Sequence, residues 1–175
     1  MEWILIRYGE IGLKSDWVRR EFENRLMKNI REGFKSRDVD GSVERGYGRI
    51  FVKTQDIEGA SDVLRKTFGI VSFSPCEKLK TDMDGITRRM ADISENFIQR
   101  DDTFSVRARR TGNHHFSSKD IEESAGSEII ERTDAKVDLD DPDKTIYCEI
   151  RQNDTYIFKD KIEGPGGLPL GTQGN

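Results

Sequence analysis

Hydrophobic and polar residues follow recognisable periods along the first half of the chain. The mostly apolar run Trp3–Tyr8 predicts a buried strand, and glycines interrupt the pattern directly after it. Apolar residues then recur every four positions, which predicts a long helix over roughly 17–34, capped by Ser15 and Asp16. Three further elements complete this half: a hairpin over 43–52 that turns at Gly46-Tyr47-Gly48, a short helix over 61–68 ended by Gly69, and a strand over 70–76.

The order strand, helix, strand, strand, helix, strand is that of a split βαβ, or ferredoxin-like, domain, which we expect over residues 1–78. A second α/β unit is predicted over 79–163, so the fold class is mixed α/β (α+β). Its expected elements are an amphipathic helix over 82–100, a strand over 104–110, a helix over 118–133, a segment at 137–139, and a hairpin of 146–150 and 156–159 about Asn153-Asp154. Residues 164–175 are crowded with glycine and proline and have no core to join, which favours a linker into another domain.

The composition indicates a highly charged globular protein. Charged residues make up 35% and hydrophobic residues 34% of the chain, and no apolar run approaches the roughly 20 residues that a membrane helix needs. The N-terminus reaches Arg7 without the apolar core of a signal peptide, so we expect a cytoplasmic protein and no membrane partner. Cys76 and Cys148 match no disulfide framework and no zinc spacing, and we expect no metal site. Cys148 alternates with apolar neighbours and is predicted to be buried.

The stretch 104–119 is basic in a chain whose formal net charge is −4. Arg107, Arg109, Arg110 and Lys119 lie in it without a carboxylate among them, on a predicted strand that leads into a helix capped by Ser117. Because the N-terminus of a helix presents free N–H groups and a positive dipole end, this arrangement suits phosphates. A solvated arginine strand on an ordinary α/β domain is the alternative, and spacing alone leaves both open.

Acidic residues gather at one predicted turn, over 138–143. Four aspartates in this short segment could suggest a divalent cation, but the glycine and the distal glutamate of a calcium loop are missing. We therefore predict a solvated turn.

Four motifs in this order resemble the tRNA 4-thiouridine synthetases, also called tRNA sulfurtransferases (the ThiI family). The run R-Y-G-E-I-G-L-K-S at 7–15 resembles the opening of these enzymes, and F-S-V-R-A-R-R-T-G-N-H-H-F-S-S-K at 104–119 resembles the central motif of their THUMP domain. Residues 137–150 resemble the closing strands of that domain, and G-P-G-G-L-P-L-G-T-Q-G at 164–174 is similar to the segment that leads into their PP-loop ATPase domain. The first and last motifs single out this family, because other tRNA-modifying enzymes also carry a THUMP domain.

The resemblance implies a ferredoxin-like domain and a THUMP domain that grip the tRNA acceptor end. In the family, a following PP-loop domain uses ATP, with Mg, to adenylate uridine 8, and sulfur then displaces AMP to give 4-thiouridine. A sulfur-donor protein such as a cysteine desulfurase is the implied partner, and some members also supply sulfur for thiamine synthesis. The resemblance leaves open whether the protein forms a homodimer. The family's Ser-Gly-Gly-x-Asp-Ser motif is expected soon after Gln173, so the resemblance implies RNA binding here, without catalytic residues or a cofactor in these 175 residues.

We hypothesise that this chain reads the shape of RNA through phosphates and unpaired ends. Contacts to acceptor-end phosphates are expected from Arg107, Arg109, Arg110 and Lys119, with backbone N–H groups near Ser117 and Ser118. The expected extension of this surface in the first domain consists of Arg7, Lys14, Arg19 and Arg20. His114, His115 or Phe116 could stack on a base, although Phe116 is also placed to pack beneath the helix as a hydrophobic staple.

Two alternatives differ in function class. The first is the RNA-binding part of another THUMP enzyme, such as a methyltransferase, which would carry a glycine-rich methyl-donor motif in place of Ser-Gly-Gly-x-Asp-Ser. The second is a protein-interaction module whose arginines meet acidic partners. Binding to tRNA with and without its 3′ single strand distinguishes these hypotheses.

Overall fold

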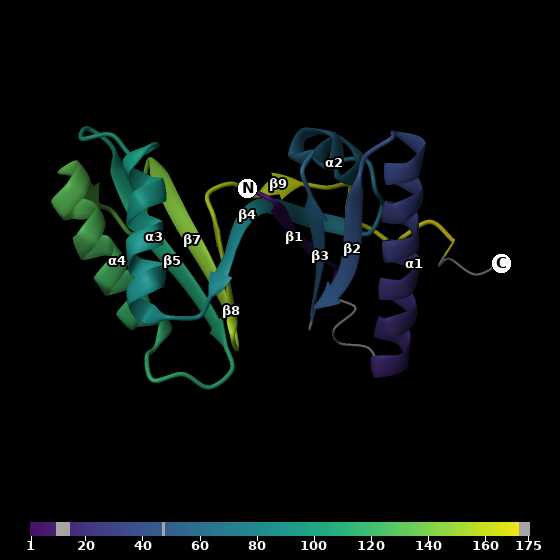
Figure 1. The fold of residues 1–175 in the computed structure, drawn as a ribbon, viewed down its shortest axis with the longest axis horizontal. Helices are drawn as coiled ribbons and strands as arrows, with labels where there is room; N and C mark the ends of the chain where they lie inside the picture. Colours follow the sequence, from purple (N-terminus) through teal and green to yellow (C-terminus); the bar gives the residue numbers. More distant parts are fainter. Residues whose placement is uncertain (10–14, 47, 172–175) are drawn as a thin grey trace. The chain divides into compact units, whose positions relative to one another are not determined.

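The computed structural model describes residues 1–9, 15–46 and 48–171, and these form two compact units (Figure 1). Unit 1 consists of residues 1–76 and the segment from Asp160 onward. Unit 2 consists of Glu77–Lys159. The mixed α/β fold class expected from the sequence is confirmed.

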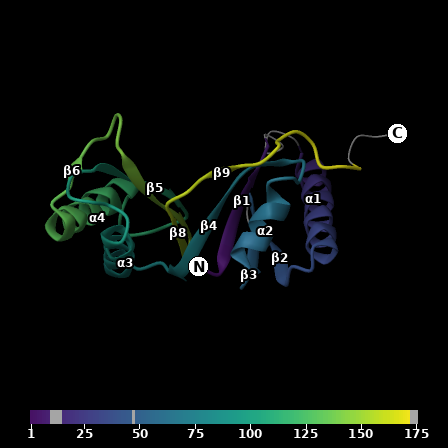
Figure 2. The same ribbon diagram turned by 90° about the horizontal axis from the view of Figure 1, so that it is seen from above.

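Unit 1 is an antiparallel sheet with two helices on one face. Its strand order is β2-β3-β1-β4, with β9 on the outer side of β4, and this order with two crossover helices is ferredoxin-like. Figure 2 shows α1 and α2 on the same side of the strands. The elements are β1 (Trp3–Tyr8), α1 (Asp16–Ser36), β2 (Gly41–Gly46), β3 (Arg49–Thr54), α2 (Ile57–Leu64), β4 (Ile70–Lys80, of which 70–76 belong to this unit) and β9 (Ile162–Glu163).

Helix α1 begins and packs as its sequence pattern predicts. The Ser15 hydroxyl accepts a hydrogen bond from the Val18 amide at 3.3 Å, which satisfies one of the free N–H groups of the first turn. The residues that recur every four positions from Phe22 onward are buried against Ile4 and Ile6 of β1. The predicted hairpin is also present, as β2 and β3, although Tyr47 at its turn lies outside the described residues.

Two expectations for unit 1 are wrong. The second helix begins at Ile57 and not at residue 61, because the Asp56 carboxylate caps it by accepting from the Gly59 amide at 2.9 Å. The glycine-rich segment after residue 163 is not separate from unit 1 at its start, because its backbone forms hydrogen bonds with residues 69–71. Its hydrogen bonds run from the Gly164 amide to the Val71 carbonyl (3.0 Å), from Gly166 to Ile70 (2.7 Å), and from Gly69 to the Gly166 carbonyl (2.8 Å).

Unit 2 is a mixed sheet with both of its helices on one face. Residues 77–80 of β4 pair with β8, and the order continues through β7 and β5 to β6. Strand β5 runs parallel to β7 and to β6. The other elements are α3 (Met83–Glu95), β5 (Thr103–Thr111), α4 (Ser118–Thr133), β6 (Lys136–Val137), β7 (Lys144–Arg151) and β8 (Asp154–Phe158). Helices α3 and α4 pack on the sheet face that carries Phe104, Ile146 and Ile150 (Figure 1).

Two element boundaries in unit 2 differ from the prediction. Helix α3 ends at Glu95 and not near residue 100. A tight turn follows it, in which the carbonyl of the buried Ser94 accepts hydrogen bonds from the Phe97 and Ile98 amides. The β7–β8 hairpin turns at Gln152-Asn153, one residue earlier than expected, and Gln152 takes the positive φ of 54°.

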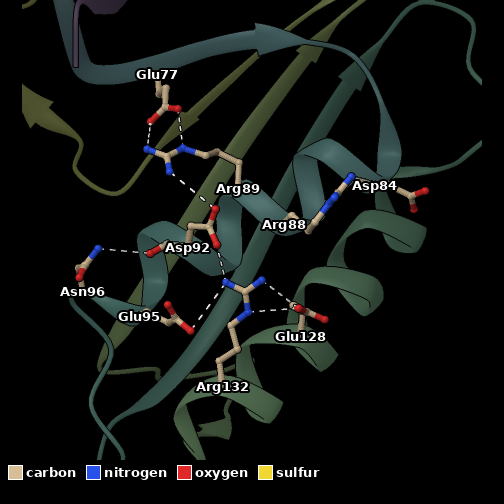
Figure 3. A network of polar contacts seen from close by, with 9 residues as sticks. All are labelled: Glu77, Asp84, Arg88, Arg89, Asp92, Glu95, Asn96, Glu128 and Arg132. Carbon is tan, nitrogen blue, oxygen red and sulfur yellow. Dashed lines mark hydrogen bonds and ion pairs between the residues drawn. The ribbon is translucent and has the colours of Figure 1, made fainter.

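Two arginines fasten α3 to its neighbours (Figure 3). Arg132 of α4 lies among three carboxylates, and Arg89 of α3 holds one carboxylate of β4 through two bonds. The nitrogen–oxygen distances are 2.5 Å from Arg132 to Asp92, 3.0 Å to Glu128 and 3.7 Å to Glu95, and 2.5 and 2.8 Å from Arg89 to Glu77. A bidentate arginine–carboxylate pair has a defined geometry, so these pairs set the helix orientation more than they add stability.

Both cysteines are buried, and Cys148 lies in the core of unit 2 as predicted. Burial raises the pKa of the Cys148 thiol to about 12, and the carboxylates of Glu122 and Glu149 raise it further. The folded thiol therefore stays protonated where the unfolded one, with an ordinary pKa of 9.0, ionises.

This shift predicts a loss of stability in alkali. The contribution of Cys148 is fully present below pH 9.0 and declines as the pH rises from there toward 12. At pH 10 we expect a loss of about 1 kcal/mol from this group, measured as the difference in urea unfolding between the chain and its Cys148→Ala variant at pH 8 and pH 10. A thiol reagent such as Ellman's should modify Cys148 quickly only after unfolding, and rapid modification of the native thiol would contradict its burial.

Candidate nucleic-acid interface

Strand β5 distributes its arginines over both faces of the unit 2 sheet. Phe104, Val106 and Ala108 point to the helix-covered face, and Arg110 follows them in the alternation of the strand. Arg107 and Arg109 fall on the other face, opposite Tyr147 and Glu149 of β7. The basic residues that are adjacent in sequence therefore do not form one continuous patch. Arg109 and Arg110 share the C-terminal end of β5, which is where open parallel sheets bind ligands.

Arg110 is held in place by groups that leave its charge uncompensated. Its Nη1 donates to the Gly112 carbonyl at 2.7 Å and lies 3.0 Å from His114 Nδ1. The other ring nitrogen, Nε2, lies 2.7 Å from the Gln152 carbonyl. A carbonyl can only accept, so Nε2 carries the hydrogen and Nδ1 accepts from the guanidinium. In the described part of the chain no carboxylate pairs with Arg110, so its charge is available to an anion.

Gly112 allows this loop to close. Its φ is +113°, and a Cβ built there would lie 2.3 Å from the Gln152 Oε1 atom. Gln152 in turn accepts from the Asn113 amide at 3.3 Å. The hairpin turn between β7 and β8 thus braces the loop that follows β5, and this brace fixes both Arg110 and His114.

The N-terminus of α4 follows directly, with the capping box expected from the sequence. Ser117 Oγ accepts from the Asp120 amide at 3.1 Å, and Asp120 Oδ2 accepts from the Ser117 amide at 2.8 Å. Within the described ranges, the amides of Ser118 and Lys119 have no intramolecular acceptor, so they can donate to a bound anion. Phe116 is half-buried and packs on the core that includes Ile121, as in a hydrophobic staple.

The other basic side chains of this stretch differ in their ion pairs and hydrogen bonds. Arg109 is exposed and has no ion pair in the described chain. The Lys119 side chain is 81% exposed and lies 3.9 Å from Glu123, a distance at which an ion pair is weak. Arg107 Nη2 donates to the Leu139 carbonyl at 2.5 Å. His115 is exposed, whereas His114 is half-buried and lies 5.3 Å from Phe116 between ring centroids.

A mainly apolar groove of about 370 Å³ lies between β5, α4 and β6. Its walls include Val106, Ile130 and Leu139, and Arg107 and Lys119 also line it. Beyond Phe104 the outer edge of β5 has no partner strand in the described residues, and the Glu122 carboxylate accepts the Ala108 amide there at 3.0 Å. The Glu122 carboxylate thus satisfies an N–H group of an edge strand, which could otherwise pair with another strand.

Of the basic residues predicted in unit 1, Arg7 lies on β1, and Arg19 and Arg20 lie on α1. Arg7 Nη1 donates to the hydroxyls of Ser72 and Ser74 on β4, at 3.2 and 3.1 Å. Arg19 lies 3.5 Å from Asp16, and Arg20 is exposed. Lys14 lies outside the described residues.

Sequence reasoning missed a cluster of polar side chains about Glu23 of α1. This glutamate is only 5% exposed. Tyr8 donates its hydroxyl to Glu23, and Arg45 Nε lies 3.0 Å from it. The only signal in the sequence is a glutamate beside Phe22, at the margin of the apolar face of the helix.

The acidic segment over 138–143 forms the predicted turn, in which the Asp138 carboxylate accepts the amides of Asp140 and Asp141 at 3.0 and 3.1 Å. In the described ranges no group of three or more possible ligands could hold a metal ion. None of the helices in those ranges has the length and apolar character needed to cross a membrane.

Comparison with known proteins identifies both units. Residues 3–74 match the family model of the ThiI ferredoxin-like domain, and residues 80–160 match that of the THUMP domain. The chain is 39% identical over 176 residues to a probable tRNA sulfurtransferase of Methanobrevibacter smithii, an alignment that covers 98% of this chain and 45% of the relative. The chain thus spans less than half the length of this curated relative.

Two solved structures share the fold over nearly the whole chain. The crystal structure of PH1313 from Pyrococcus horikoshii has a TM-score of 0.89 and 37% sequence identity, and the match covers 98% of this chain and 58% of that one. The crystal structure of a 4-thiouridine synthetase–RNA complex with bound ATP has a TM-score of 0.80 and 29% identity, with 99% and 45% covered.

Proposed function

Because this chain belongs to the tRNA sulfurtransferase family, with a ThiI ferredoxin-like domain and a THUMP domain, we propose that it is the tRNA-binding portion of an enzyme that makes 4-thiouridine at position 8 of tRNA. It holds the acceptor end of the tRNA and performs no chemistry by itself. The observation that carries this proposal is the positively charged end of β5 beside the free amides of α4, within a THUMP domain. The match over residues 3–74 favours this family over a THUMP methyltransferase.

The described geometry suits phosphates better than base edges. Arg110 presents a guanidinium fixed by Gly112 and His114, Arg109 adds an exposed one, and the amides of Ser118 and Lys119 lie at the positive end of a helix. Helical RNA presents phosphates and 2′-hydroxyls, while its base edges lie in a deep, narrow groove. These contacts would therefore recognise shape and an unpaired end, and position the tRNA for chemistry elsewhere.

That chemistry is assigned to the part of the relatives that this chain does not span. One solved structure that contains bound ATP is that of a 4-thiouridine synthetase–RNA complex, and this chain covers 45% of it. We assign ATP, with Mg, and a sulfur-donor protein such as a cysteine desulfurase to the whole enzyme in the cytoplasm, with a further link to thiamine synthesis. The residues described here would supply only the grip on the tRNA.

The proposal is tested by fluorescence anisotropy with labelled tRNA and with the same tRNA lacking its 3′ single strand. We expect the shortened tRNA to bind about 10-fold more weakly, because contacts to the unpaired end are lost. Equal affinities would refute recognition of the acceptor end. Failure to bind any tRNA, together with binding of an acidic polypeptide, would favour the protein-interaction alternative.

A further inference from the structure

In unit 1, side chains from three separate elements meet at one buried carboxylate. Glu23 of α1 is 5% exposed and accepts the hydroxyl of Tyr8, from β1. The Nε of Arg45, from β2, lies 3.0 Å from the other carboxylate oxygen of Glu23. Arg45 also donates to the Asn24 side chain, so its guanidinium is held along two of its edges.

Further arginines lie near this cluster. Arg19 and Arg49 are close enough to the Tyr8 hydroxyl to favour its ionised form. Arg19 also lies 3.5 Å from the carboxylate of Asp16, which is fully exposed. Burial, followed by the bond to Glu23, raises the pKa of Tyr8 far above its ordinary value, so Tyr8 remains a neutral donor and adds no charge.

The hydrogen bonds of Arg45 leave one nitrogen of its guanidinium available to a ligand. Its Nε bonds to Glu23 and its Nη2 to Asn24, while Nη1 has no partner in the described part of the chain. About a third of the side chain is exposed, at 32%. A guanidinium that is held from below by a carboxylate and is open on its other edge loses little side-chain entropy when it binds a phosphate.

We propose that unit 1 contains a second phosphodiester-binding site, in which Arg45 contacts the RNA backbone and Glu23 is its positioning residue. This inference rests on the proposed function, because it supposes that RNA is the ligand. It adds a contact on β2 of unit 1 to those of the basic stretch of unit 2. The favoured ligand is a phosphodiester and not a base, because the groups presented are guanidinium N–H donors.

Substitution of Glu23 separates positioning from simple charge. If Glu23 only offset the positive charge, Glu23→Gln would strengthen RNA binding, since it removes a negative charge near phosphates. If Glu23 positions Arg45, the same change weakens binding. A glutamine oxygen can still accept from Arg45 while its amide donates to the Tyr8 hydroxyl, which can also accept, but the bond to the guanidinium is no longer charge-assisted and holds Arg45 less firmly.

The experiment measures tRNA binding by anisotropy between about 50 and 200 mM salt, with the chain and its variants, after circular dichroism has confirmed folding. Arg45→Ala is expected to weaken binding about 5- to 10-fold and to reduce the slope of log K against log salt by about one. Arg45→Lys keeps the charge and should restore most of the slope. Arg65→Ala, on a 50% exposed arginine paired with Asp62 in the same unit, removes an equal charge and should change neither quantity.

Each outcome decides the matter. Loss of slope with Arg45→Ala, its recovery with Arg45→Lys, and about 3-fold weaker binding with Glu23→Gln would support the site. A purely structural Arg45 would lower the unfolding midpoint and leave the salt slope equal to that of Arg65→Ala, which overturns the inference. Tighter binding by Glu23→Gln would overturn the positioning role. Absence of tRNA binding by the unaltered chain would instead refute the proposed function itself.

Discussion

Replacing Arg109 and Arg110 together by alanine is expected to weaken tRNA binding by about 150-fold and to reduce its salt slope by about two. The two guanidiniums lie at the same end of β5 and have no carboxylate partner in the described chain. Each charge-assisted bond to a phosphate contributes on the order of 1.5 kcal/mol, and two lost contacts release two fewer counterions. The measurement is anisotropy with labelled tRNA over a range of salt.

A matched control removes the same charge from another part of unit 2. Arg88 and Arg100 are both exposed, and Arg100 precedes the opposite end of β5. The double variant Arg88→Ala and Arg100→Ala should bind tRNA with nearly the original affinity. If both double variants lost affinity equally, binding would depend on net charge alone, and the site at the end of β5 would be refuted.

This distinction matters because these 175 residues are acidic overall. Its formal net charge is −4 and its pI is near 5.4, so long-range attraction to RNA is weak. Binding must then come from local placement, in which a cation is held without a carboxylate partner of its own. The Arg110 partners serve this end, since a carbonyl and a neutral imidazole orient the guanidinium without cancelling its charge.

The sequence predicted those parts of the fold whose causes are local. Helix α4 begins at Ser118 as expected, because Ser117 and Asp120 form a capping box within four residues. Strand β1 also lies where it was predicted, because its continuous apolar run is a local signal too. The start of α2 lies earlier than predicted, because Asp56 caps the helix ahead of the segment 61–68.

The parts that were not predicted depend on distant residues. The clamp on Arg110 needs Gln152, whose carbonyl holds His114 across a separation of 38 residues. The cluster about Glu23 needs β1, α1 and β2 to meet. By contrast, the separation of Arg109 from Arg110 could have been read directly, because consecutive residues of a strand point to opposite faces.

The second large effect is expected in the core beneath the arginines. Phe104 is fully buried on the helix-covered face of β5, and Phe104→Ala removes a ring that packs among the side chains of α3, α4 and β7. Such a truncation leaves a cavity that close-packed neighbours fill only in part, so we expect a loss of about 4 kcal/mol in the free energy of unfolding. Urea unfolding followed by circular dichroism measures this change.

The same variant separates stability from binding. Phe104 points away from Arg107 and Arg109, so below the urea midpoint the folded variant should bind tRNA within about 2-fold of the original affinity. Phe68→Ala removes a phenylalanine that is 48% exposed and should cost less than about 1 kcal/mol. If Phe104→Ala cost no more than Phe68→Ala, the two-layer core of unit 2 would be wrong. If it abolished binding while the variant remained folded, the grip on RNA would depend on the packing of β5 as well as on its charges.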